Sequence, residues 1–221
     1  TDPSEGIINI AWKKPDRLDT IPNVSGPFEY YIYRAKGIQS NDYILIDSIS
    51  TTDLNDTTYI DTPIDTETSG YIYRIELYNR TPGFEFMIGE PGIASSLFLE
   101  ASPGDRKARF TISRNVPWIN TAYDIFRFNE ATASYDSVGT TNQLNYIDPG
   151  LVNYEEYCYY IRSSGGYLAE GMPKGLVNFS QITCVTPVDN EPPCAPVIDV
   201  TSECDSLYNK VIWRIEDPEC F

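Results

Sequence analysis

The sequence predicts an all-β protein, and three observations support that class. Short runs that alternate apolar with polar residues, rich in Ile, Val, Thr, Tyr and Phe, are separated by Gly, Pro, Asn and Asp. No segment sustains the i, i+3, i+4, i+7 apolar spacing of a long amphipathic helix. The set of runs also occurs twice along the 221 residues, which indicates two copies of one domain.

The first copy is expected to contain six strands. Two of them end at a proline, which cannot donate a hydrogen bond to a strand ladder. The expected strands are residues 8–13, 30–34, 43–47, 58–61, 71–77 and 97–99. Alternation points these side chains inward: Ile8, Ile10, Trp12, Tyr30, Ile32, Tyr71, Tyr73, Ile75, Leu77, Leu97 and Leu99.

The second copy repeats the first at similar spacings. Ile32-Tyr33-Arg34 returns at position 125 as Ile125-Phe126-Arg127, an offset of 93 residues. Tyr59-Ile60-Asp61 returns as Tyr146-Ile147-Asp148 at an offset of 87, and the strand at Tyr71 returns at Tyr157 at an offset of 86. Changes in loop length explain this drift. Trp12, Phe110 and Trp213 mark the equivalent early strand in three copies.

Four segments follow from the repeat. Residues 1–101 are expected to form the first domain, without its first strand, and residues 102–187 the second. Ser102-Pro103-Gly104-Asp105 is expected to form the turn between them. Residues 188–193 are expected to be a proline-stiffened linker. Residues 194–221 are expected to be the N-terminal part of a third, truncated domain.

These features resemble tandem fibronectin type III domains. The early Trp12, the run at residues 30–33 and the Tyr-x-Tyr-x-Ile strands carry the resemblance. It implies an all-β fold of two consecutive fibronectin type III-like β-sandwiches plus the first strands of a third. It also implies that Tyr71 and Tyr157 are corner tyrosines, whose hydroxyls bond a nearby backbone carbonyl. Residues 157–160 and 191–196 further resemble repeat regions of bacterial gliding-motility-associated, type IX-secreted cell-surface proteins.

The cysteines predict one disulfide. Cys158 lies where the first copy has Ile72, and Cys184 where it has Phe98, both at an offset of 86 residues. In a sandwich these are outward positions on neighbouring strands, so a Cys158–Cys184 bridge is expected, with two free thiols as the alternative. Closing this loop would stabilise the fold by roughly 3 kcal/mol in the chain-entropy model. Cys194, Cys204 and Cys220 leave one thiol unpaired, and no Cys-x-x-Cys spacing indicates a metal site.

Outward side chains suggest one binding surface. Tyr31, Tyr33, Arg74 and Tyr78 could form an aromatic and basic strip that binds a sugar or a peptide. The alternative is that these side chains pair across strands and only stiffen the sheet.

Two weaker patterns concern modification and Ca²⁺. The Asp-Ser/Thr-apolar triplets at Thr20, Ser48, Ser137 and Ser206 fit the O-glycosylation signal of the bacteria named above, and Ser48 and Ser137 are expected at equivalent places in the two copies. Chance explains such short motifs as well. Acidic clusters at residues 53–56 and 216–219 could hold Ca²⁺, although solvated turns explain them better.

Composition excludes several function classes. The 32 acidic and 16 basic side chains give a net charge of −16, which disfavours nucleic acid and anionic lipid as partners. The chain has no histidine, so Ser-His-Asp and Cys-His catalysis and His-ligated metals are excluded. No catalytic or nucleotide-binding glycine motif is present. We therefore expect no enzyme activity, no cofactor and no apolar stretch that inserts into a membrane.

Two functions remain. The favoured one is a non-catalytic segment of a secreted, cell-surface protein that acts as spacer and adhesion-type interaction module. Its expected partners are a protein or glycan at the cell surface and neighbouring domains of the same longer chain. Cysteine usage favours an oxidising, extracellular location. The alternative is an accessory region of a secreted polysaccharide-degrading enzyme whose catalytic domain lies outside this sequence.

Overall fold

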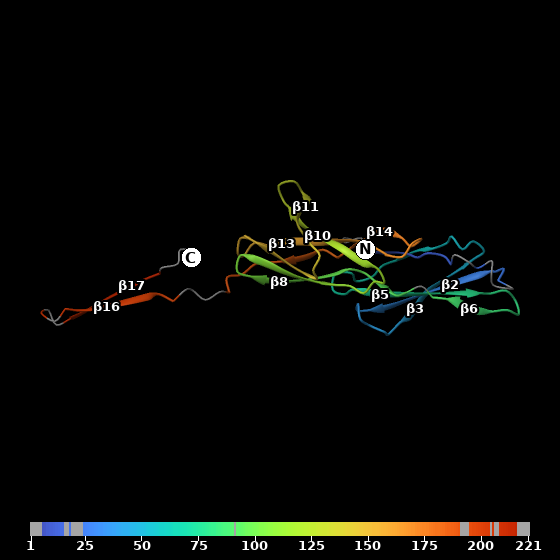
Figure 1. Cartoon of the computed structure of the whole chain (residues 1–221), viewed down its shortest axis with the longest axis horizontal. Helices are drawn as coiled ribbons and strands as arrows, with labels where there is room; N and C mark the ends of the chain where they lie inside the picture. Colours follow the sequence, from blue (N-terminus) through green and yellow to red (C-terminus); the bar gives the residue numbers. More distant parts are fainter. Residues whose placement is uncertain are drawn as a thin grey trace.

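The computed structural model describes residues 6–15, 18, 24–90, 92–190, 195–203, 205 and 208–215. Every regular element among these residues that is four or more residues long is a β-strand, and all strand pairs are antiparallel. Two sandwiches follow each other along the chain, and a separate hairpin comes after them (Figure 1). The predicted all-β class with two consecutive sandwiches is confirmed.

The first sandwich consists of a small and a large sheet. The small sheet pairs β1 (Ile8–Ala11) with β4 (Thr58–Asp61). The large sheet has the order β3-β2-β5-β6, with β7 also paired to β5. Its strands are β2 (Phe28–Lys36), β3 (Ile44–Thr51), β5 (Tyr71–Asn79), β6 (Phe86–Gly89) and β7 (Ala94–Ser95).

The second sandwich repeats this order and has one more strand in its small sheet. That sheet has the order β12-β9-β8, and the large sheet has the order β11-β10-β13-β14, with β15 paired to β13. The strands are β8 (Phe98–Gly104), β9 (Lys107–Ser113), β10 (Ile119–Asn129), β11 (Ser134–Thr141), β12 (Asn145–Pro149), β13 (Tyr157–Gly166), β14 (Lys174–Phe179) and β15 (Thr183–Val185). The β10–β11 hairpin projects from the body of this sandwich (Figure 1).

Each sandwich buries the side chains that alternation points inward. Tyr30, Ile75 and Leu77 are at most 5% exposed in the first sandwich. Phe110 and Tyr159 are at most 2% exposed in the second, with ring centroids 4.6 Å apart. Burial of such large side chains removes apolar area from water and drives the two sheets together. Two predicted core residues, Ile10 and Trp12, are only half-buried.

The strand expected at residues 97–99 was assigned to the wrong sandwich. Phe98–Gly104 pairs with β9, and Leu99 lies in the core of the second sandwich. The buried side chain of Gln181 secures this strand: its Nε2 donates to the Leu99 carbonyl at 2.6 Å, and its Oε1 accepts from the Leu99 N–H. The expected boundary between residues 101 and 102 therefore falls inside β8.

The turn expected at Ser102-Pro103-Gly104-Asp105 is also displaced. Pro103 lies within β8 opposite Ala108, which an edge strand allows because its outer N–H groups need no partner. Gly104 pairs with Lys107, so the reversal uses only Asp105 and Arg106. Arg106 has a φ of 52°, the left-handed conformation that tight hairpins require.

Ile72 is another correction, because alternation places it on the outer face and the structure buries it. It is 1% exposed, and its cross-strand neighbours Ala35 and Ser95 are 2% and 5% exposed. These three residues lie opposite one another on β2, β5 and β7, and Ser95 forms hydrogen bonds with Asn115 of the second sandwich. Ile72 pairs with Ser95 and not with Phe98, so the expected equivalence of Cys184 with Phe98 is wrong.

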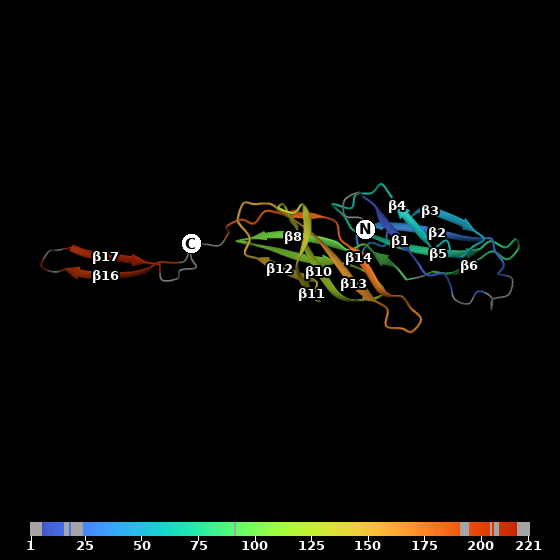
Figure 2. The same cartoon turned by 90° about the horizontal axis from the view of Figure 1, so that it is seen from above.

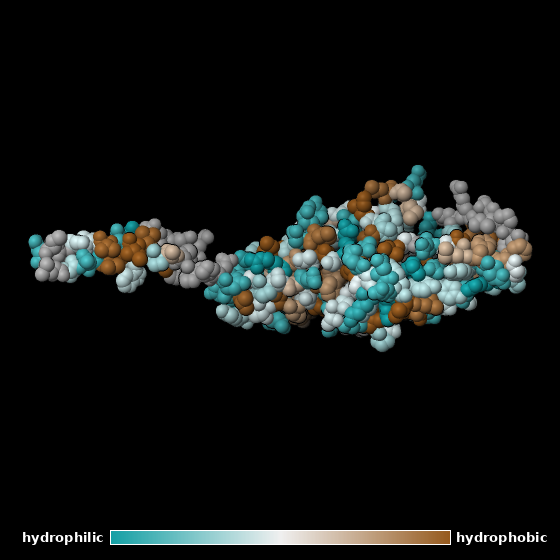
Figure 3. All heavy atoms as spheres, turned by 90° about the horizontal axis from the view of Figure 1, so that it is seen from below, coloured by the Kyte–Doolittle hydropathy of each residue, from teal (hydrophilic) through white to brown (hydrophobic). Residues whose placement is uncertain are grey.

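The C-terminal hairpin pairs β16 (Val197–Glu203) with β17 (Tyr208–Arg214). Figure 2 shows it extending away from both sandwiches. Its apolar side chains are exposed; Trp213, for example, is 70% exposed, and brown spheres gather there in Figure 3. Residues 191–194 and 216–221 lie outside the described residues, so the linker and third-domain expectations are only partly covered. No helix among the described residues could cross a membrane.

Candidate interaction surface

Each sandwich contains a polar triad that joins its two sheets. In the first, the Arg34 guanidinium on β2 donates to both carboxylate oxygens of Asp61 on β4, at 2.9 Å each. The hydroxyl of Tyr73 on β5 donates to the same carboxylate at 2.7 Å. Asp61 is only 5% exposed, so its charge depends on these donors.

The second sandwich has the same triad. Arg127 and Tyr159 donate to Asp148, both at 2.8 Å, and Asp148 is 6% exposed. The three positions follow the sequence repeat, from residues 34, 61 and 73 to 127, 148 and 159. The recurring Ile-x-Arg, Tyr-Ile-Asp and Tyr-x-Tyr patterns thus contain the residues that link the two sheets of each sandwich.

The triads change the acidity of their tyrosines. Burial raises the pKa of Tyr73 far above its usual value, and the hydrogen bond to the Asp61 carboxylate raises it further. The same two causes raise the pKa of Tyr159 beside Asp148. Both phenols therefore stay protonated as donors throughout the neutral range.

The corner tyrosines lie beside the triads, and the carbonyl bond expected of them is not what Tyr157 makes. Arg34 lies over the ring of Tyr71 at 5.5 Å, and Arg127 over the ring of Tyr157 at 5.7 Å. The Tyr157 hydroxyl accepts from the Val152 N–H and donates to Glu155, each at 3.1 Å. The Tyr157 hydroxyl therefore satisfies a backbone N–H group, whereas the expected bond would have satisfied a backbone carbonyl.

The predicted strip is brought together on the outer face of the first sandwich. Tyr31 and Tyr78 make an edge-to-face contact with ring centroids 5.3 Å apart. Arg74 lies 4.8 Å from the ring centre of Tyr33. All four side chains are half-buried.

Arginines already cover the rings of this strip. Arg74 also lies 4.8 Å from the ring centre of Tyr43, and Arg80 lies 5.4 Å and 5.0 Å from those of Tyr31 and Tyr78. Both cations have carboxylate partners: Arg74 is 3.1 Å from Glu76, and Arg80 is 2.7 Å from Glu29. The geometry favours the interpretation that these side chains pair across strands and stiffen the sheet. The arginines already cover the ring faces, and neighbouring carboxylates already pair with the arginines.

The second sandwich carries an aromatic cluster that sequence reasoning missed. At an offset of 86 residues Tyr160 takes the place of Arg74, and it stacks on Phe126 with ring centroids 4.8 Å apart. Tyr135 and Phe179 contact Tyr160, and Phe128 contacts Tyr135. The sequence signal for this cluster is that an aromatic residue, Tyr160, stands where the first copy has Arg74. It makes this outer face more apolar than that of the first sandwich.

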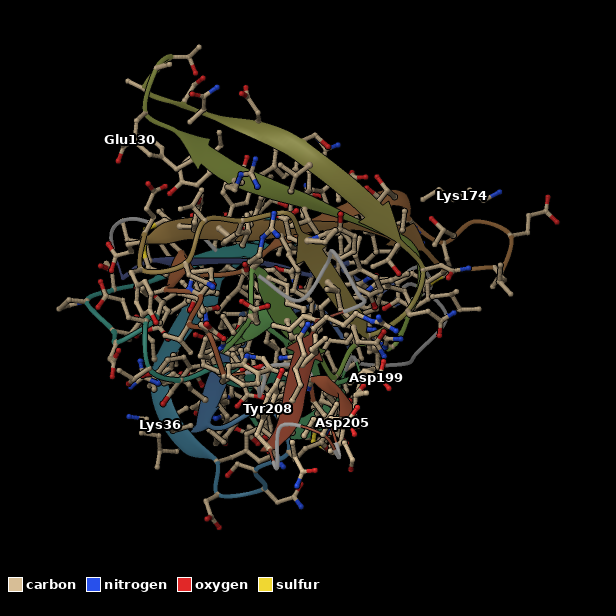
Figure 4. The ribbon with its side chains drawn as sticks, turned by 90° about the vertical axis from the view of Figure 1, so that its left-hand side faces the viewer. Lys36, Glu130, Lys174, Asp199, Asp205 and Tyr208 are labelled. Atoms are coloured by element: carbon tan, nitrogen blue, oxygen red, sulfur yellow. A yellow bond between two sulfur atoms is a disulfide. The ribbon has the colours of Figure 1, made fainter. Side chains whose placement is uncertain are left out.

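A groove of about 800 Å³ adjoins this cluster. It lies between the projecting β10–β11 hairpin, whose tip carries Glu130 in Figure 4, and the turn before β13. Its lining includes the carboxylates of Glu130, Asp136, Glu155 and Glu156. Arg127 also lines the groove, but its charge is already paired with Asp148.

The structure joins Cys158 and Cys184 in a disulfide, with Cα atoms 4.0 Å apart. The two residues lie directly opposite each other on β13 and β15. Their counterparts in the first copy are Ile72 and Ser95, which are also paired. Cys194, Cys204 and Cys220 lie outside the described residues.

The modification sites do not coincide in the two copies. Ser48 and Ser137 are both exposed, but Ser48 lies opposite Tyr31, whereas Ser137 lies opposite Phe126, the counterpart of Tyr33. The residue opposite Tyr33 is Leu45, so the expected equivalence of the two serines is wrong. Both hairpins carry a register shift at the same place, after Ile32 and after Ile125, so the position equivalent to Ser137 is Leu45, three residues before Ser48. Thr20 and Ser206 lie outside the described residues.

The first of the two acidic clusters forms a turn. The carboxylate of Asp53 accepts from the Asn55 N–H at 3.0 Å, and that of Asp56 accepts from the Thr51 hydroxyl at 2.6 Å. These local bonds are those of a solvated turn. Residues 216–219 lie outside the described residues.

Direct hydrogen bonds join the two sandwiches. The Ser95 N–H donates to the Asn115 carbonyl at 2.8 Å, and the Asn115 N–H donates to the Ser95 hydroxyl at 2.7 Å. Asn178 donates to the Ser95 carbonyl at 3.2 Å, and Asn115 donates to the Ile38 carbonyl at 3.4 Å. Ser95 ends the last strand of the first sandwich and β8 begins at Phe98, so little free chain separates the two.

Comparison with known proteins adds structural similarity only. No family model and no curated protein matches the chain. The chain is similar in structure to the chicken interferon gamma receptor alpha chain, at 14% identity over 81% of this chain and 92% of that one, with a TM-score of 0.33. It is similar to a two-domain fibronectin type III segment of chicken tenascin, at 14% identity over 84% and 93%, with a TM-score of 0.27. It is similar to the central fibronectin-III array of RIM-binding protein, at 13% identity over 97% and 76%, with a TM-score of 0.29.

Proposed function

We propose that this chain is a non-catalytic segment of a secreted, cell-surface protein, in which consecutive sandwiches form a stiff spacer. The outer faces of the large sheets provide surfaces for a protein or glycan partner. The narrower assignment, to the gliding-motility-associated, type IX-secreted proteins of bacteria, belongs to the same proposal and rests on the resemblance of residues 157–160 and 191–196.

The junction between the sandwiches is the observation that carries the spacer role. If the connection were flexible, the polar groups of Ser95 and Asn115 would form hydrogen bonds with water. Here these two residues form two hydrogen bonds with each other. The residues paired beside Ser95 are also buried: Ile72 is 1% exposed and Ala35 is 2% exposed. A bonded and buried junction transmits orientation from one domain to the next, as a spacer requires.

Two further properties support an extracellular setting. The Cys158–Cys184 disulfide persists in oxidising compartments. The net charge of −16 keeps neighbouring arrays soluble and mutually repelling.

Pulsed electron paramagnetic resonance tests the spacer role. One nitroxide is attached at Thr52→Cys in the first sandwich and one at Thr132→Cys in the second, both exposed positions, with Cys194, Cys204 and Cys220 changed to Ser. We expect a single narrow distance distribution. The double variant Ser95→Ala/Asn178→Ala removes two junction bonds and should broaden it.

The control for this experiment is Ser50→Ala/Ser102→Ala, which changes exposed residues paired with Glu29 and Arg109, outside the junction bonds, and should leave the distribution narrow. A broad distribution in the parent chain would show that the sandwiches reorient freely. In that case the spacer proposal is wrong.

A further inference from the structure

The geometry points to a zinc site that exists only when the Cys158–Cys184 disulfide is reduced. Three metal-ligating groups meet at this bridge: the two sulfur atoms and the carboxylate of Glu156. Their ligand atoms all lie within 4.8 Å of one another. No other group of three such residues comes together in the part of the chain that the structure describes.

Strand pairing places the two cysteines together, and Glu156 adjoins them. Glu156 lies immediately before β13, and its carboxylate lies within 4.8 Å of both sulfur atoms. Cys184 lies directly opposite Cys158 on the neighbouring strand. The pairing of the two cysteines belongs to the backbone ladder between β13 and β15 and does not depend on the sulfur–sulfur bond.

The spacing suits tetrahedral Zn²⁺. Two thiolates bound at about 2.3 Å in tetrahedral geometry stand just under about 4 Å apart, a separation that opposed side chains on adjacent strands can reach. A carboxylate oxygen serves as the third ligand. Cys184 and Glu156 are exposed and Cys158 lines the 800 Å³ groove, so the fourth position is open to water.

The redox step balances with a thiol reductant. Two equivalents of an external thiol reduce the disulfide: the Cys158–Cys184 bond breaks, the external thiols are oxidised to their own disulfide, and both cysteines become thiols. Zn²⁺ then displaces two protons as it binds the thiolates. An external disulfide reverses the sequence: it is reduced to two thiolates, the Cys158–Cys184 bond forms again and Zn²⁺ is released.

Such a site would hold the correct pair of thiols together in a chain with five cysteines. A metal-bound thiolate is shielded from exchange with Cys194, Cys204 or Cys220 until oxidation closes the bridge. The zinc site would thus protect the two thiols while the chain is reduced, before the disulfide forms in the extracellular setting proposed above.

Cobalt titration tests the site, because Co²⁺ substitutes for Zn²⁺ and gives visible absorption when four-coordinate with thiolates. The full chain carrying Cys194→Ser, Cys204→Ser and Cys220→Ser is reduced with a phosphine and titrated with CoCl₂ without oxygen. We expect saturation at one Co²⁺ per chain, displacement by Zn²⁺, and stoichiometric zinc release when oxidised glutathione is added.

Glu156→Gln should weaken Zn²⁺ binding at least tenfold, since it replaces a charged ligand and leaves both cysteines in place. Glu155→Gln is the matched control, because its carboxylate bonds Tyr157 and lies outside the ligand group. An unchanged affinity in Glu156→Gln, or no saturable Co²⁺ absorption in the reduced parent, overturns the proposal. Retained strand circular dichroism in the reduced parent shows that either outcome refers to folded protein.

Discussion

Arg34 donates to both carboxylate oxygens of Asp61 across the two sheets of the first sandwich, at 2.9 Å each. Arg127 and Asp148 repeat the contact in the second sandwich at 2.8 Å. A buried carboxylate with charged and phenolic donors is costly to disturb, because removing its charge leaves the donors unpaired. This relationship explains why three separated sequence patterns recur together.

Changing Asp61 to Asn should destabilise the first sandwich, and Asp148→Asn the second, because the arginine loses its charged partner. We expect each substitution to lower the free energy of unfolding by about 2 kcal/mol, less than for a fully buried pair since the arginines are partly exposed. Denaturant unfolding measures the loss. Glu130→Gln, at the exposed tip of the projecting hairpin, should change nothing measurable. Equal free energies of unfolding for all three variants would show that the triads do not stabilise the sandwiches.

Stability should fall as the pH rises above about 10, the ordinary tyrosine pKa. The raised pKa values of Tyr73 and Tyr159 mean that the folded chain keeps protons that the unfolded chain has lost. Their contribution is therefore complete below pH 10 and is lost as the pH rises toward the folded-state values.

Urea unfolding between pH 8 and pH 11 measures this loss. In Tyr73→Phe the free energy of unfolding should fall less steeply with pH above pH 10. Tyr154→Phe is the control, since Tyr154 is 74% exposed. An alkaline limb unchanged in Tyr73→Phe would contradict the assignment.

Reducing the disulfide should destabilise the second sandwich and leave the first unchanged. Loop closure over the 26-residue separation contributes roughly 3 kcal/mol in the chain-entropy model. Hydrogen exchange with and without reductant, in a chain whose Cys194, Cys204 and Cys220 are serine, would locate the effect in β13 and β15. Protection lost in β2 and β5 instead would show that the two sandwiches do not unfold separately.

Arg74→Ala should lower the stability of the first sandwich by about 1–2 kcal/mol, because two ring contacts and two ion pairs disappear. Lys36→Ala is a suitable comparison, since Lys36 is 61% exposed and its ion pair with Asp65 spans 3.8 Å. Thermal unfolding distinguishes the two variants. If Arg74→Ala is neutral and the wild-type chain binds a sugar on a glycan array, the strip is a binding site and not a brace.

The sequence was most informative where one physical rule acts alone. Alternation predicted most of the buried faces because a two-residue period assigns each side chain to one face. Repetition predicted the Cys158–Cys184 pair, although it matched Cys184 with Phe98 and the strand pairing matches it with Ser95. The repeated patterns contain the triad residues, but no contact among them was predicted. Alternation failed at Ile72, which occupies an outward position and is nevertheless 1% exposed, because a two-residue period does not record which outward positions are covered.

The strand at Phe98–Gly104 was misassigned for a related reason. A short apolar run predicts a strand but not its partner, and here the choice depends on Gln181, which lies 82 residues away. Ser48 and Ser137 share a short Asp-Ser-apolar triplet, but strand pairing places them three residues apart, because a triplet does not record the register of a strand. The aromatic cluster around Tyr160 was within reach, since the repeat offset alone pairs Tyr160 with Arg74.

Residual dipolar couplings of backbone N–H groups in both sandwiches test the central claim most directly. A stiff pair of repeated sandwiches predicts that one alignment tensor fits the couplings of residues 28–79 and 107–163 together. Two tensors of different magnitude would mean that the domains reorient independently, and the account of this chain as a rigid spacer would be contradicted.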